Sequence, residues 1–220
     1  MISKEFDKGI DVQSDNAHQK LLDAAEKLFA EKGFDGTSVR DITNEAKCNV
    51  AAVNYHFGGK DNLYKEAFRR KLILLRDVRV KRIDEVMSHA GETTLEDLIR
   101  AFGKAFFEPL VGVSGGHRFI KLWLREMLDQ RLPASMFIEE TFRPVLDSLQ
   151  KALLKVCPSL GEARSMSSAH AVVGQLAHLL QIHEFWAQAH DSPEFDLNSA
   201  LEYIVEFSAA GIRGFAKGSK

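Results

Sequence analysis

The sequence predicts an all-α protein of about nine helices, and three observations carry that prediction. Apolar residues recur three and four positions apart along most of the 220 residues, as on the buried face of a helix. No segment shows the apolar–polar alternation that is typical of a half-buried strand. Glycine, proline and helix-capping residues divide the chain into segments of helical length.

The composition is that of an ordinary globular chain with one locally basic segment. Hydrophobic residues make up 45% of the chain and charged residues 27%, which allows a sizeable buried core. The formal net charge is −2, which by itself disfavours a nucleic-acid partner. Residues 60–82, however, hold nine Lys/Arg side chains against three acids. Such a segment allows one part of an acidic chain to contact phosphate groups.

The sequence predicts a cytoplasmic protein without a cofactor, a metal site or a membrane segment. Its two cysteines, Cys48 and Cys157, lie far apart and lack metal-ligand spacing, so no disulfide framework is expected. The N-terminus lacks the apolar stretch of a signal peptide, and no apolar run reaches the ~18–20 residues of a membrane helix. No catalytic motif is visible and the histidines are scattered, which disfavours an enzyme.

The first helix is expected to begin near Asp15, after a flexible polar arm of residues 1–14. Apolar side chains then follow the i, i+3/i+4, i+7 spacing of a buried stripe. They are Leu21, Leu22, Ala25, Leu28 and Phe29. Gly33 ends this helix, because glycine adopts the left-handed conformation of a helix C-terminus at little cost.

A second helix and a short third helix follow, joined by a tight turn. In "DGTSVRDITNEA", Thr37 or Ser38 can cap the second helix, and Asp41 lies in its first turn near the positive end of the helix dipole. Residues 47–49 separate it from "VAAVNYHF", which is two turns long at most. Two helices joined by a short turn, the second of them short and weakly hydrophobic, are the helix-turn-helix pattern.

The rest of the chain is predicted to be helical as well. After Gly58-Gly59 a long helix runs from Lys60 or Asp61 to about Met87, and Thr93 or Thr94 opens the next helix with a capping box. Further helices are expected at residues 117–131, 133–156 with a bend at Pro144, 161–189 and 196–216.

The segments "LLDAAEKLFAEKGFDGTSVRDITNEA" and "YHFGGKDNL" resemble the TetR family of bacterial transcriptional regulators over about residues 17–70. The resemblance implies a helix-turn-helix DNA-binding domain at 15–62 and an effector-binding and dimerisation domain at 63–220. The string "NVAAVNYHFGGK" is similar to a subgroup in which drug-responsive or efflux-gene regulators are expected. Two positions depart from the family pattern: Lys47 stands where a turn glycine is usual, and Asn54 stands where a tyrosine is usual.

The short third helix has the residue types that reading DNA requires. Small side chains let a helix approach the base edges, and Asn54 can pair with adenine in the major groove. Aromatic, histidine, lysine and hydroxyl side chains at the helix margins can donate to phosphates, and the resemblance gives Arg40 a base or phosphate contact. The predicted DNA-binding residues are Thr37, Ser38, Arg40, Asn49, Val50, Ala51, Ala52, Asn54, Tyr55, His56 and Lys60. Val53 and Phe57 are predicted to be core, and packing of Tyr55 on the first helix remains an alternative.

The last two helices are the predicted seam of a homodimer. They are apolar over more than one face and rich in small residues, which allow close helix packing between two chains. The predicted interface residues are Ala171, Gly174, Gln175, His178, Ile182, Ile204, Phe207 and Gly211. The alternative is that both helices pack only within their own chain.

Aromatic residues and methionines in the middle helices predict a pocket for a small-molecule effector. The residues are Phe102, Phe106, Phe119, Trp123, Glu126, Met127, Phe137, Phe142, His183 and Trp186. For each of these residues taken singly, a place in the core is the simpler interpretation.

The favoured function is a repressor that binds a palindromic DNA operator as a dimer and is released by a small, largely apolar effector. The alternative is a helical scaffold or partner-binding protein that has lost sequence-specific DNA reading. Lys47 and the near-neutral charge of residues 16–59 keep that alternative open.

Overall fold

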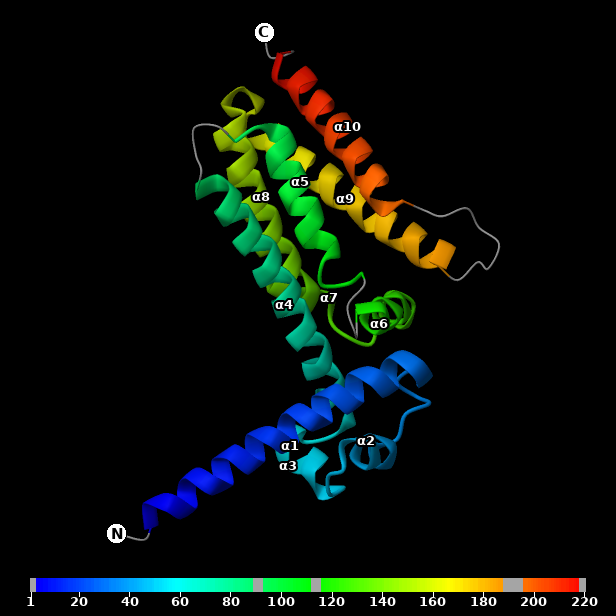
Figure 1. Cartoon of the computed structure of the whole chain (residues 1–220). Helices are drawn as coiled ribbons and strands as arrows, with labels where there is room; N and C mark the ends of the chain where they lie inside the picture. The colour runs from blue at the N-terminus through cyan, green and yellow to red at the C-terminus, as the bar shows by residue number, and fades with distance from the viewer. Residues whose placement is uncertain (1–2, 89–92, 112–115, 188–195, 218–220) are drawn as a thin grey trace. The chain divides into compact units, whose positions relative to one another are not determined.

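The structure, a computed structural model, describes residues 3–88, 93–111, 116–187 and 196–217 (Figure 1). Within these ranges every regular element is a helix, which confirms the all-α prediction. If the unbroken helical run of residues 134–156 is taken as one, the same ranges contain nine helices longer than one turn. None of the described helices combines the length and the apolar character that crossing a membrane demands.

The chain divides into two compact units. Unit 1 comprises Met1–Leu72 with Ser114–Ala134, and unit 2 comprises Ile73–Val113 with Ser135–Lys220. The part of the chain that folds with the helix-turn-helix therefore extends beyond the predicted end at residue 62. The extension includes a later segment, since α6 (Gly116–Asp129) packs against the first helix.

The first helix of unit 1, α1, spans Ser3–Lys32. The flexible arm predicted for residues 1–14 is thus helical from Ser3 onward. Nothing in this segment stops a helix, because it contains no proline and a single glycine, Gly9. The predicted end of the helix is confirmed, since Gly33 has a φ of 76° and its amide donates to the Phe29 carbonyl at 2.9 Å.

The two helices of the predicted helix-turn-helix are α2 (Val39–Ala46) and α3 (Ala51–Phe57). Both lie along one side of α1 in Figure 1. Ser38 caps α2 in a capping box with Asp41. Lys47 ends α2 in the left-handed conformation, with φ 54° and ψ 42°. The turn therefore needs the backbone geometry that glycine adopts most easily, and a lysine supplies it.

A chain of aromatic contacts forms the core of unit 1. The rings of Phe29 and Tyr64 lie 4.9 Å apart, those of Tyr64 and Phe68 5.4 Å, and those of Phe68 and Phe119 5.6 Å. These residues join α1, the first turns of α4 (Lys60–Ser88) and α6. Burial of such rings supplies much of the stabilisation of a small core.

Unit 2 is a bundle of helices around one apolar core. Its elements are the second half of α4, α5 (Leu95–Phe107), α7 (Ala134–Phe137), the π-helix η1 (Ile138–Phe142), α8 (Arg143–Val156), η2 (Pro158–Leu160), α9 (Glu162–Ala187) and α10 (Leu197–Lys217). Its most completely buried side chains include Leu98, Ile99, Phe102, Leu149 and Leu176. In Figure 1, α5, α8, α9 and α10 lie side by side, as their contacts require.

The bend predicted at Pro144 takes the form of a π-helix. Pro144 lies in the first turn of α8, directly after η1. Proline has no amide hydrogen and its ring collides with the preceding turn, so the α-helical hydrogen bond to that turn is lost. The wider π turn relieves this conflict without breaking the helical run.

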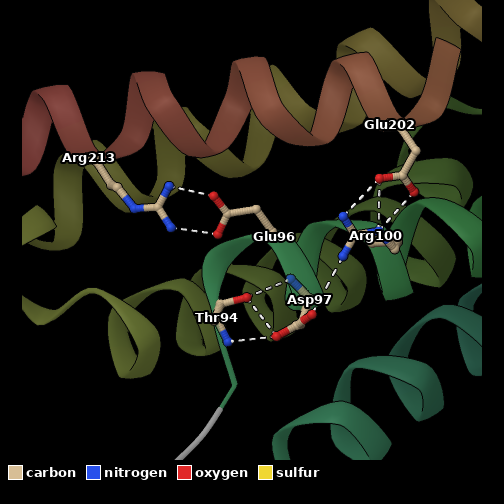
Figure 2. Close-up of polar contacts among 6 residues, drawn as sticks. All are labelled: Thr94, Glu96, Asp97, Arg100, Glu202 and Arg213. Atoms are coloured by element: carbon tan, nitrogen blue, oxygen red, sulfur yellow. Dashed lines mark hydrogen bonds and ion pairs between the residues drawn. The ribbon is translucent and has the colours of Figure 1, made fainter. Parts of the chain in front are cut away.

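Helices α5 and α10 are joined by two ion pairs (Figure 2). Arg100 donates to both carboxylate oxygens of Glu202, at 2.8 and 3.0 Å, and Arg213 pairs with Glu96. The hydrogen bonds from Arg100 hold the pKa of Glu202 below its ordinary value. At the start of α5 the capping box predicted for this helix is present, between Thr94 and Asp97.

Candidate functional site

Helix α3 is fixed to unit 1 by two buried side chains. Val53 and Phe57 face the interior, as predicted, and the ring of Phe57 stacks on His18 of α1 at 4.6 Å. Asn49 accepts a hydrogen bond from the Ala51 amide at 2.9 Å and so caps the first turn of α3. The short helix is therefore anchored by one face and by its N-terminal end.

The opposite face of α3 is open. Val50, Ala51, Asn54 and Tyr55 are all exposed, and Ala52 is half-buried. Tyr55 is 80% exposed, so it does not pack on the first helix, the alternative that the sequence left open. Small, apolar and amide side chains on one exposed helix face are what close approach to base edges requires.

The hydroxyl groups of Thr37 and Ser38, which precede α2, are less available for DNA contacts than predicted. Thr37 is 1% exposed, and its hydroxyl donates to the carbonyls of Leu28 and Gly33. The prediction of Thr37 as a DNA-binding residue is therefore wrong, because the side chain holds the turn after α1. Ser38 is exposed, but its hydroxyl donates to Asp41 at 2.6 Å within the capping box. Its hydrogen bonds hold the pKa of Asp41 below its ordinary value.

Arg40 is the most available charged side chain of the predicted set. It is exposed on α2, and no described residue forms a hydrogen bond or ion pair with it. The helix it stands on is tied to α1 by the pair of Lys27 and Glu45, whose charged atoms lie 2.7 Å apart. A free guanidinium on a fixed helix is suited to a phosphate or a guanine edge.

His56 and His18 form a pair that sequence reasoning missed. The ring of His56 lies 5.8 Å from that of His18 and 4.9 Å from that of Tyr55. His56 is half-buried, so part of this side chain is used in packing and part of it reaches solvent. No local signal in the sequence links His18 to α3, because the contact depends on how α1 crosses it.

Lys60 lies over the ring of Phe34, with its ammonium 4.1 Å from the ring centroid. Arg131 lies near the same ring at 4.7 Å and pairs with Asp35. Much of the basic segment 60–82 has partners of this kind: Arg70, for example, donates to Gln19, Asp23 and Glu26 of α1. Other cations of the segment pair within α4, as Lys81 does with Glu85. Much of its positive charge is therefore engaged inside the protein, and the segment offers DNA less charge than its composition suggests.

Comparison with known proteins finds one family match in the N-terminal part of the chain and one in the C-terminal part. The family described as "Bacterial regulatory proteins, tetR family" matches residues 21–67. The family described as "Tetracyclin repressor-like, C-terminal domain" matches residues 100–211, half of the chain. The chain belongs to the TetR family.

Curated relatives resemble this TetR-family chain over part of their length. The probable HTH-type transcriptional regulator YttP of Bacillus subtilis is 50% identical over 44 residues, which are 20% of this chain and 21% of that protein. The biofilm operon icaADBC HTH-type negative transcriptional regulator IcaR of Staphylococcus epidermidis is 31% identical over 106 residues, 48% of this chain and 51% of that protein. The match thus spans between about a fifth and a half of these relatives.

Solved structures share the fold over nearly the whole chain. The transcriptional regulator FadR of Bacillus subtilis, in complex with stearoyl-CoA, has a TM-score of 0.65 at 16% identity, covering 88% of this chain and 98% of FadR. The multidrug binding protein EbrR, complexed with malachite green, has a TM-score of 0.61 at 23% identity, covering 86% of this chain and 96% of EbrR. TetR-family proteins are DNA-binding transcriptional regulators and not enzymes, and some respond to ligands.

The pocket residues predicted for the TetR-family effector domain divide between the two units. In unit 1, Phe119 is buried in the aromatic core and Trp123 is half-buried beside it. Glu126 is buried, and each of its carboxylate oxygens already accepts a hydrogen bond within the protein, from the Tyr64 hydroxyl at 2.8 Å and from the Leu132 amide at 2.6 Å. Glu126 was predicted to bind the ligand, and in the structure it instead stabilises unit 1. Met127 is exposed on α6.

The remaining pocket residues belong to unit 2. Phe102, Phe106 and Phe137 are buried, His183 is half-buried, and Phe142 and Trp186 are exposed. Phe106 lies beneath a buried guanidinium, that of Arg79, whose Cζ is 3.9 Å from the ring centroid. Across the described residues of the chain, no group of three or more His, Cys, Asp or Glu is placed to hold a metal ion.

Most of the predicted dimer residues lie on the outside of unit 2. Ala171, Gly174 and His178 of α9 and Phe207 and Gly211 of α10 are exposed. Gln175 and Ile182 are half-buried, and Gln175 donates to the Ser208 hydroxyl at 3.1 Å. Ile204 differs from the prediction, because it lies in the hydrophobic core of its own chain and is not on the exposed face.

Proposed function

We propose that this TetR-family protein is a cytoplasmic repressor that binds a palindromic DNA operator as a homodimer and is released by a small, largely apolar effector. The observation that carries the proposal is the exposed face of α3, with Asn54 and Tyr55 directed away from the anchored face. In this proposal α3 enters the major groove, where Asn54 reads a base edge and the alanine and valine side chains contact thymine methyl groups.

The residues around α3 position it on the DNA backbone. Phosphates on either side of the groove accept hydrogen bonds from Arg40, Tyr55, His56 and Lys60. Ser38 lies at the N-terminus of α2 and adds a further phosphate contact there. Asn49 serves mainly as the cap of α3 and holds the helix in register. Each neutralised phosphate releases counterions, so the affinity for DNA decreases as salt increases.

The dimer is proposed to form through the exposed faces of α9 and α10. Tyr203, Phe207 and Phe215 are large apolar side chains exposed on α10, and an added Cβ at Gly174 or Gly211 would meet nothing within 4 Å. An apolar face with small residues suits helix packing between two chains. Two chains related by a two-fold axis read an inverted repeat, with half-sites about one helical turn apart or a multiple of it.

The effector is proposed to bind in unit 2 against its buried aromatic residues. FadR and EbrR, which share the fold, were solved with stearoyl-CoA and with malachite green, two ligands with large apolar parts. An effector that binds one conformation better than the other shifts the population toward it, and effector and operator then oppose each other reciprocally.

The first test is selection of bound duplexes from a random DNA pool, followed by titration of the enriched duplex at two salt concentrations. We expect an inverted repeat, bound by two chains, whose affinity decreases as salt rises. Failure to enrich any sequence, with protein from which bound ligand has been removed by refolding, would contradict the proposal. That result would favour the helical scaffold that the sequence also allows.

A further inference from the structure

Unit 2 contains one buried charged side chain within its described residues, Arg79 of α4. It is 6% exposed, and its Nε is enclosed without a hydrogen-bond partner. The guanidinium lies against the ring of Phe106, with its Cζ 3.9 Å from the ring centroid. The other buried polar residues described in this unit are Thr141, Ser165, Ser168 and Ser208, all neutral.

Every other arginine of unit 2 has a partner. Acceptors are assigned to Arg76, Arg82, Arg100, Arg143, Arg164 and Arg213, five of them carboxylates and one, for Arg164, the carbonyl of Phe215. Arg79 is the exception, and it is also the most deeply buried. The bundle thus pairs its more exposed arginines, whereas its most buried one has no hydrogen-bond or ion-pair partner among the described residues.

A guanidinium on a residue that is only 6% exposed, with an enclosed Nε that lacks a hydrogen-bond partner, is unfavourable. Burial lowers the pKa of Arg79 to about 9, which leaves the side chain protonated at neutral pH. The stacking contact with Phe106 offsets only part of the cost of removing the Arg79 charge from water. The aromatic face replaces water on one side of the guanidinium plane only. The edge of a guanidinium carries its hydrogen-bond donors, and a planar carboxylate matches that edge.

We propose that the effector of this regulator is an organic anion whose acidic headgroup pairs with Arg79 and whose apolar body lies among the aromatic residues of unit 2. The inference rests on the proposed function, in that it assumes an effector, and it names the chemical class of that effector. A ligand of this class supplies the missing counter-charge and so stabilises the bundle on binding. Neutral ligands of the same shape leave the charge of Arg79 unpaired.

The helix that carries Arg79, α4, contacts an irregular part of the bundle through Arg76. Arg76, one turn earlier on the same helix, lies within 3.5 Å of the Glu140 carbonyl in the π-helix η1. π-helices are frequent at functional sites, because their wider turn leaves carbonyl groups outside the regular ladder. The same π-helix contains Thr141, whose side chain is buried.

The test uses the full chain without DNA and two matched sets of probes. The first set is octanoate, octanamide and octylammonium, and the second is 1-naphthoate, 1-naphthamide and 1-naphthylmethylammonium. Binding is measured by isothermal titration calorimetry and by the shift in unfolding temperature. We expect at least one acid to raise the unfolding temperature and to bind at least about tenfold more tightly than its amide.

Substitutions test whether the preference for the acid over the amide depends on Arg79. Arg79→Met should abolish the preference for the acid over the amide, and Arg79→Lys should keep part of it, because the charge remains but the planar fork is lost. Arg82→Met, one turn along the same helix, removes the same charge from an exposed ion pair and should leave the preference unchanged. Without ligand, Arg79→Met should unfold at the same temperature as the wild type or higher, because it removes an uncompensated buried charge.

Three results would overturn the inference. They are equal binding of acid and amide by the wild type, an acid preference that persists in Arg79→Met, or no response of the wild type to any acid in either set. If a neutral compound releases the protein from its operator, the inference fails and the proposed function stands. If no operator is found, the proposed function fails and pairing at Arg79 is still measured.

Discussion

The hydroxyl of Tyr64 donates a hydrogen bond of 2.8 Å to a carboxylate oxygen of Glu126. Both side chains are buried in unit 1, and the second carboxylate oxygen accepts from the Leu132 amide. The pair therefore ties the start of α4 to the end of α6 and to the turn that follows it. Its oxygen atoms are satisfied from inside the protein, which explains a buried carboxylate in an aromatic core.

Removing this hydrogen bond should destabilise the protein measurably. Tyr64→Phe leaves the buried carboxylate without one of its donors, and we expect the free energy of unfolding to decrease by about 2 kcal/mol. Urea denaturation at neutral pH measures the change. Tyr55→Phe removes the same hydroxyl from an exposed ring and should change the stability by less than about 0.5 kcal/mol. Equal effects of the two variants would contradict a structural role for the pair.

The burial of Tyr64, together with this hydrogen bond, makes the stability depend on pH. Burial, followed by the hydrogen bond and the charge of Glu126, raises the pKa of Tyr64 well above its ordinary value. A raised folded-state pKa gives stability that is fully present below about pH 10, the value for an unfolded chain, and is lost at higher pH. The stability difference between wild type and Tyr64→Phe should therefore shrink above pH 10 and stay constant from pH 7 to 9.

The turn between α2 and α3 should be stabilised by glycine. Lys47 has a φ of 54°, which costs a residue with a Cβ about 1 kcal/mol, and the side chain is exposed. Lys47→Gly should therefore raise the free energy of unfolding by about 1 kcal/mol. Lys47→Ala removes the charge and keeps the strain, so it should show no gain. A gain of the same size in both variants would indicate a charge effect.

Local signals explain what the sequence predicted correctly. The helix cap at Ser38, the capping box at Thr94 and the end of α1 at Gly33 depend on residues within one turn, and all are present. The buried positions of Val53 and Phe57 follow from helical spacing in the same way.

Residues whose roles depend on distant parts of the chain were assigned less well. The partners of Thr37 include the carbonyl of Leu28 in the preceding helix, and those of Glu126 include Tyr64, 62 positions away. Ile204 is on α10 at a position that could face either a partner chain or its own core, and only packing decides between them. Arg79 lies in the basic segment 60–82, and nothing in the sequence distinguishes it from the other lysines and arginines there as the one that is buried.

Arg40 should contribute to DNA binding through a phosphate. Arg40→Ala should weaken binding to all sequences by a similar factor and reduce the slope of log affinity against log salt by about 1. Arg143→Ala, which removes an exposed arginine from α8, serves as the control and should leave the slope unchanged. Fluorescence anisotropy on one enriched and one random duplex measures both quantities. An unaltered slope for Arg40→Ala would remove this residue from the interface.

Phe207 should lie in the dimer interface. It is 61% exposed and stacks on Tyr203 at 6.2 Å, and a charge at its position would be buried on association. Phe207→Glu should weaken dimerisation at least about tenfold, as seen in sedimentation equilibrium. Leu128→Glu changes a residue that is 84% exposed on α6, and it should leave the dimer intact. A stable dimer of Phe207→Glu would place the interface elsewhere.

The most direct test of DNA reading by α3 is a comparison of the sequences that wild type and Asn54→Ala select from one random pool. The wild type should enrich an inverted repeat. The variant should enrich the same repeat without a preference at one base pair in each half-site, at symmetric positions, because Asn54 reads a single base edge. Identical motifs for the two proteins would contradict the assignment of the exposed face of α3 as the reading surface.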